Sequence, residues 1–140
     1  MALNDIEIYQ LIRTAFALCD EVGTALKARR EFNLADQLLR AALSVGNNFA
    51  EGYGRSATGE RLMLMFYADG SAQECKNCLN SAVDLNIIEA GKAQELNALF
   101  SRISIGIIEF CAWILRQDPD YNGAFRERVE KRRAWRFRKR

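Results

Sequence analysis

The feature that most constrains the fold is a set of apolar side chains that recur every three or four residues along almost the whole chain. This spacing places side chains on one face of an α-helix. Four such stripes run over residues 5–29, 34–49, 58–83 and 89–114, and no segment shows the strict alternation of a half-buried strand. The sequence therefore predicts an all-α protein.

The breaks between the stripes carry residues that begin or end helices. Asn33 is placed to cap the second helix, and the glycines of residues 52–56 end it. The third helix is expected to begin near Thr58 and to end at Asn86, and the fourth to end before Pro119, the only proline. Four stripes of similar length with short connections predict an antiparallel up-down-up-down four-helix bundle over residues 1–118.

Length and composition exclude several classes of protein. A chain of 140 residues suits one domain, and 49% apolar residues are too many for a disordered protein. The sequence has no histidine, so it lacks an imidazole base, a Ser-His or Cys-His pair and any His-ligated metal. Residues 1–8 do not resemble a secretory leader, and no stretch of about 18 uncharged apolar residues predicts a membrane span. We expect a cytoplasmic protein without a cofactor.

The cysteines favour packing over chemistry. Cys75 and Cys78 have the CxxC spacing, but they lie within a helical pattern, without a second CxxC or a preceding strand. Cys19 and Cys111 are isolated in the sequence. We expect four reduced, buried thiols and no metal site.

Charge is distributed unevenly along the chain. Residues 1–118 carry 11 Lys or Arg against 15 Asp or Glu, whereas residues 119–140 carry 9 against 3. Cations interleaved with aromatic rings can neutralise phosphates and stack on bases, which predicts a nucleic-acid-binding tail. The alternatives are a solvated helix, or one whose Phe125, Val129 and Trp135 dock on the bundle. The predicted nucleic-acid-binding residues are Arg126, Arg128, Lys131, Arg132, Arg133, Trp135, Arg136, Phe137, Arg138, Lys139 and Arg140.

A polar line interrupts the apolar pattern of the second and third helices. Its members are Arg40, Ser44, Asn48, Glu51, Ser71 and Glu74. With Leu34, Gln37, Ala41, Gly52 and Gly70 they form an ordered pattern, NLADQLLRAALSVGNNFAEGYGR followed by ADGSAQE, which resembles the four-helix-bundle family encoded in intervening sequences of large-subunit ribosomal RNA genes. Phe49 departs from the pattern, since the family usually has a smaller aliphatic residue there.

The resemblance implies a homopentameric ring or barrel without known enzymatic activity. The chain is also similar to the accessory variability determinant of diversity-generating retroelements, a pentamer that binds nucleic acid and a reverse transcriptase. The basic tail extends beyond the usual end of the family's bundle.

The polar line has two physical interpretations. Antiparallel packing of the second and third helices would bring Arg40 to Glu74 in a structural network that fixes register, or in a subunit interface. The glycines at positions 46, 52 and 70 would let backbones approach closely, in the bundle core or between subunits. Alternatively, Glu51 and Glu74 could form a catalytic or metal-binding pair, but the Glu-x-x-His motif of di-iron bundles is absent.

These patterns together favour a non-enzymatic homo-oligomer that binds structured RNA or an RNA/DNA hybrid through its basic surface and tail. Such a protein would be an accessory to a ribosomal RNA or reverse-transcriptase complex. The alternative function is a ring-shaped scaffold for another protein, in which affinity for nucleic acid is incidental.

Overall fold

The computed structural model describes residues 2–138, and the described residues form helices without a strand. A short 3-10 helix, Leu3–Asp5, precedes five α-helices. These are α1 (Glu7–Ala28), α2 (Phe32–Gly54), α3 (Thr58–Asp84), α4 (Ala90–Gln117) and α5 (Ala124–Arg138). The predicted all-α bundle is confirmed.

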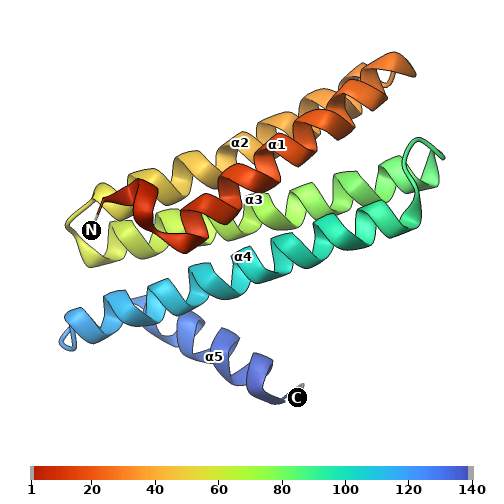
Figure 1. The fold of residues 1–140 in the computed structure, drawn as a ribbon. Helices are drawn as coiled ribbons and strands as arrows, with labels where there is room; N and C mark the ends of the chain where they lie inside the picture. Colours follow the sequence, from red (N-terminus) through yellow and green to blue (C-terminus); the bar gives the residue numbers. More distant parts are fainter. Residues whose placement is uncertain (1, 139–140) are drawn as a thin grey trace.

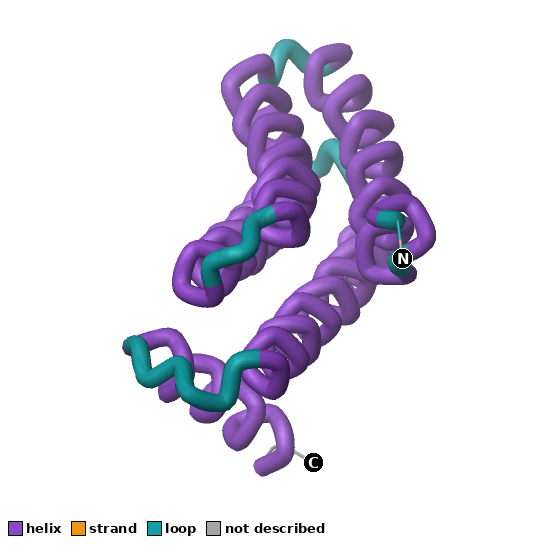
Figure 2. Tube along the Cα trace, turned by 90° about the vertical axis from the view of Figure 1, so that its left-hand side faces the viewer, coloured by secondary structure: helices purple, strands orange, loops and turns teal. Residues whose placement is uncertain are grey.

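Helices α1 to α4 lie side by side, and successive helices alternate in direction (Figure 1). Packing joins α1 to α2, α2 to α3, α3 to α4, and α4 back to α1. Helix α5 turns back at the end of α4 and lies on the outside of the bundle, where it contacts α4 and α3 (Figure 2). The chain beyond Pro119 is therefore an ordered helix over Ala124–Arg138.

The core lies where the four apolar stripes meet. All four cysteines are buried and unpaired, as expected. Burial raises the pKa of the Cys111 thiol to about 12, and a hydrogen bond with Cys19 together with burial raises that of Cys75. The largest fully buried side chains are Leu26, Leu38, Val45, Phe49, Leu62, Met65, Leu79, Leu96, Phe100, Ile103, Ile107 and Ile114.

Most of the predicted helix ends agree with the structure. Helix α3 begins at Thr58, whose Oγ1 donates a 2.7 Å hydrogen bond to Oδ2 of Asp118 at the end of α4. The prediction that Asn33 caps α2 is wrong, because Glu31 is the N-cap and Asn33 lies within the helix. Helix α3 ends at Asp84, before Asn86, which adopts a positive φ of 59°.

Helix α4 is long and apolar enough to cross a membrane by length and composition alone. Half of its most apolar window is buried within the bundle. Its apolar face packs against α1 and α3, as expected for a core helix.

Of the three glycines expected at close contacts, only Gly52 is tightly packed. A Cβ there would lie 3.1 Å from Leu64 Cβ and 3.3 Å from the Arg61 carbonyl oxygen. A Cβ at Gly46 would make an ordinary contact with Ile12, and one at Gly70 would meet nothing within 4 Å. Within this chain Gly70 makes no close contact, so a close approach there remains a prediction for a contact between subunits.

This difference predicts opposite effects of alanine at two helical glycines. Gly70→Ala should raise the free energy of unfolding by about 0.5 to 1 kcal/mol, because alanine loses less backbone entropy in a helix. Gly52→Ala should lower it by about 1 to 3 kcal/mol, because the added methyl group meets the neighbouring helix. Urea unfolding measures both, and changes of the same sign would contradict the packing described for Gly52.

Candidate nucleic-acid interface

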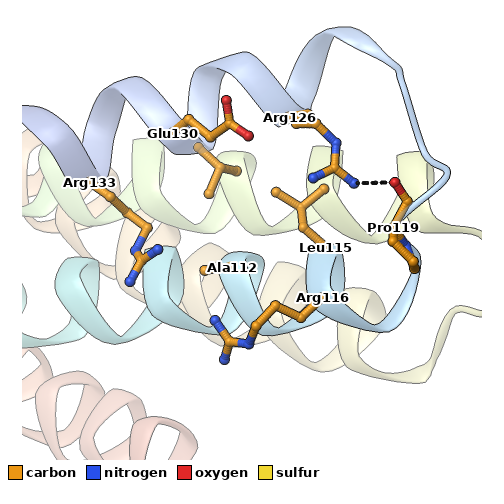
Figure 3. Close-up of a pocket in the computed structure, with 8 residues that line it drawn as sticks. Ala112, Leu115, Arg116, Pro119, Arg126, Glu130 and Arg133 are labelled. Carbon is orange, nitrogen blue, oxygen red and sulfur yellow. Dashed lines mark hydrogen bonds between the residues drawn. The ribbon is translucent and has the colours of Figure 1, made fainter.

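The turn between α4 and α5 directs the basic helix back onto the bundle. Arg126 closes this turn: its Nε donates a 2.7 Å hydrogen bond to the Tyr121 carbonyl, and its guanidinium donates to the Asp118 carbonyl. The guanidinium also donates to the Pro119 carbonyl (Figure 3). A Cβ at Gly123 would lie 2.3 Å from the Tyr121 hydroxyl, so a side chain there would force the Tyr121 ring to move.

Ion pairs with two carboxylates of the bundle hold α5 in place. Arg132 Nη1 lies 2.7 Å from Oδ2 of Asp69, which is only 5% exposed in α3. Arg133 and Arg136 share Oε1 of Glu109 in α4, at 3.2 and 2.9 Å. Three of the predicted nucleic-acid-binding arginines therefore contact acidic side chains of the bundle.

Apolar and cation–π contacts complete the docking of α5. Val129 is 1% exposed and belongs to the hydrophobic core. The ring of Phe125 stacks on Phe66 of α3 with 5.6 Å between centroids, and the Arg128 guanidinium lies 4.2 Å from the Phe66 ring centroid. The docked alternative is thus what the structure shows for Phe125 and Val129, whereas Trp135 is 57% exposed.

The remaining predicted residues of the tail differ in exposure. Lys131 and Arg138 are exposed, and Lys131 pairs with Glu127 one helical turn earlier, at 2.9 Å. Lys139, Arg140 and the side chain of Phe137 lie outside the described part of the chain. Cations in α5 therefore serve two roles: some hold the helix, and others face solvent.

Two grooves border α5. One, of about 580 Å³, lies against the end of α4, and its lining includes Arg116 of α4 and Arg126, Glu130 and Arg133 of α5 (Figure 3). The other, of about 340 Å³, lies between α3, α4 and α5 and includes Trp135.

Sequence reasoning missed two cations in these grooves, Arg116 and Lys76. Lys76 follows Asp69 by seven residues, which places both side chains on one face of α3. Asp69, an acidic residue on an otherwise apolar face of α3, was the sequence signal that a basic partner packs against this face.

Hydrogen bonds connect only part of the polar line on α2 and α3. Asn48 Nδ2 and Ser71 Oγ both donate to Ser44 Oγ, at 2.9 and 2.8 Å. The expected pairing of Arg40 with Glu74 is wrong: Arg40 is exposed and pairs with Asp36 of its own helix at 3.6 Å. Side chains four residues apart lie next to each other on one helix, so this ion pair forms within α2 alone.

The two glutamates of the polar line do not share one site. Glu51 pairs with Arg55 at 2.6 Å, and that hydrogen bond raises the pKa of the Arg55 guanidinium. Glu74 lies instead in a shallow groove of about 460 Å³ with Ser44, Asn48 and Ser71. No cluster of three or more Cys, Asp or Glu suited to a metal ion occurs within residues 2–138.

Comparison with known proteins places the bundle in a family. The sequence profile of the 23S rRNA-intervening sequence proteins matches residues 4–108. The chain belongs to this family. The matched residues include Asp69 and the whole polar line of α2 and α3, and they end before Glu109 and α5.

The fold also occurs in a solved structure of a protein of unknown function from the S23 ribosomal protein family of Bacteroides thetaiotaomicron. That protein is 17% identical in sequence, and the match covers 74% of this chain and 97% of that one with a TM-score of 0.70. No curated protein matches the chain. This likeness shows a shared fold.

Proposed function

We propose that this 23S rRNA-intervening sequence family member is a non-enzymatic homo-oligomer, a pentamer, that binds structured RNA or an RNA/DNA hybrid through α5. It would act as an accessory to a ribosomal RNA or reverse-transcriptase complex. The observation that carries the proposal is a basic helix fixed on the bundle by its own arginines, with further cations and an indole on its exposed side.

The charge of α5 supports binding to a polyanion. The helix carries seven Lys or Arg against two Glu, and Asp69 and Glu109 are its acidic partners on the bundle. Seven cations against these four carboxylates leave a net charge of +3. Arginine suits phosphate because its planar fork presents several donors at once.

The exposed polar line supports self-association. Arg40, Glu51 and Glu74 are exposed, and Glu74 lines a groove with Gly70, where an added Cβ would meet nothing within 4 Å, so a second copy could reach this surface. A ring of five copies would bring five α5 helices together, and such multivalency raises avidity without any new contact.

One observation favours the scaffold alternative. A groove of about 470 Å³ between α1 and α2 is lined mainly by apolar side chains beside Arg13 and Asn47, and its Phe16 and Leu43 are 36% and 52% exposed. Apolar side chains at such a groove suit a protein partner or another subunit better than they suit a phosphate backbone.

A charge-reversal pair tests the proposed RNA interface without undocking α5. Lys131→Glu/Arg138→Glu changes two exposed cations and leaves the ion pairs to Asp69 and Glu109 intact. We expect RNA affinity to fall at least about tenfold. We also expect one or two phosphate contacts to be lost, and each lost contact should make the plot of log affinity against log salt concentration less steep by about 0.7 to 0.9. Fluorescence anisotropy with a structured RNA hairpin at several salt concentrations measures both quantities.

The matched control is Lys27→Glu/Arg29→Glu, which makes the same charge change near the end of α1. It should retain affinity within about twofold. Equal losses in the two variants would show that net charge alone attracts RNA, and failure of the unchanged protein to bind would overturn the proposal. Light scattering on each variant reports whether the oligomer persists, and a monomeric mass for the unchanged protein would overturn the pentamer.

A further inference from the structure

The groove between α3, α4 and α5 combines features that the basic tail alone does not have. It encloses about 340 Å³, within the lower range of small-molecule sites. Its lining comes from three helices and includes Gln73, Lys76, Ser101, Ser104, Ile105, Ile108, Arg132, Arg133, Trp135 and Arg136.

The charge of this groove is positive although some of its cations are paired. Four cations line it, one lysine and three arginines, and no carboxylate does; Asp69 and Glu109, outside the lining, pair with the three arginines. Two carboxylates against four cations leave a charge of about +2, enough to balance a phosphate group. Lys76 Nζ donates a 2.6 Å hydrogen bond to Ser101 Oγ, which holds the ammonium at the groove.

The apolar side of the groove is exposed to solvent. Trp135 is 57% exposed and Ile105 is 44% exposed, although both are large apolar side chains. An indole provides the flat surface on which a nucleobase stacks, and a branched aliphatic side chain can contact a base edge or sugar. Ser104 and Gln73, joined by a 3.4 Å hydrogen bond, supply polar groups to the same groove.

We propose that this groove binds one unpaired nucleotide, with the base on Trp135 and Ile105 and the phosphate near Lys76 and Arg136. The inference rests on the proposed nucleic-acid binding and narrows its target to RNA with single-stranded loops, bulges or ends. A base inside a duplex presents only its edges, so it cannot stack on a side chain unless it leaves the helix.

The test compares single-stranded and duplex RNA of the same length, and uses Trp135→Ala with Trp135→Phe as its matched control. The alanine variant should bind the single strand at least about fivefold more weakly, because one stacked base is lost, and bind the duplex within about twofold of the unchanged protein. The phenylalanine variant retains an aromatic face and should remain close to the unchanged protein on both RNAs.

A second variant tests the phosphate half of the groove independently. Lys76→Met keeps the length of the side chain and removes its charge, and it lies on α3, outside the basic tail. Lys76→Met should weaken binding of the single-stranded RNA more than binding of the duplex. A polyglutamate peptide with the same charge as the RNA tests for binding of anions in general; it should bind weakly, and Trp135→Ala should not change its affinity.

The outcomes separate the two proposals. Equal losses on single strand and duplex, or binding of polyglutamate that depends on Trp135, would overturn the nucleotide site and leave the broader RNA interface in place. Failure of the unchanged protein to bind either RNA would overturn the proposed function as well.

Discussion

Replacing Phe49 with alanine is expected to lower the free energy of unfolding by about 3 to 5 kcal/mol. The Phe49 ring is fully buried, with its centroid 6.3 Å from that of Tyr9 and 5.6 Å from that of Phe110. Its contacts join α2 to α1 and α4, so truncation leaves a cavity where three helices meet. Urea unfolding followed by far-UV circular dichroism measures the loss.

Phe32→Ala is the matched control for this prediction. Phe32 lies in the same helix and is 57% exposed, so the same truncation should change stability by no more than about 0.5 kcal/mol. Phe49→Leu should cost less than Phe49→Ala, because leucine refills part of the space. Similar losses at positions 32 and 49 would show that the aromatic contacts described here do not determine stability.

The sequence predicted the bundle well because the signals for its helices are local. The stripes repeat at the helical period, and residues that cannot continue a helix stand at the breaks, as Pro119 does after α4. The failure at Asn33 has a physical cause: α2 begins two residues earlier, and the Glu31 carbonyl accepts the first bond, from Ala35 N–H, without a side-chain cap. A capping residue is favourable but is not required.

The candidate site was harder to predict because its contacts join distant parts of the chain. Arg132 and Asp69 are 63 residues apart, and their pairing depends on the angle at which α5 turns back from α4. A run of cations resembles a solvated helix until its acidic partners are located. The pairing of Arg40 with Glu74 failed for the opposite reason: a local partner, Asp36, already lay one helical turn away.

Arg132→Ala is the second large effect we expect. The substitution leaves the Asp69 carboxylate buried without its ion-pair partner, and Oδ1 of Asp69 already lacks a hydrogen bond. Loss of a hydrogen bond between charged groups should lower the free energy of unfolding by about 1.5 to 3 kcal/mol. We also expect faster tryptic cleavage within α5, because the helix loses one of the contacts that hold it to α3.

Asp69→Asn separates the effect of the ion pair with Arg132 from the effect of the other contacts that hold α5 on the bundle. The amide keeps the shape of the side chain and can still accept a hydrogen bond from Arg132, which is 41% exposed and can be hydrated once the carboxylate is gone. Its loss of stability should therefore be smaller than that of Arg132→Ala, and α5 should stay resistant to trypsin. If Asp69→Asn were the more damaging change, the carboxylate would stabilise the bundle independently of Arg132. If neither variant exposed α5 to trypsin, the apolar contacts of Phe125 and Val129 would suffice to hold the helix, and the arginines would be available to phosphate at little cost in stability.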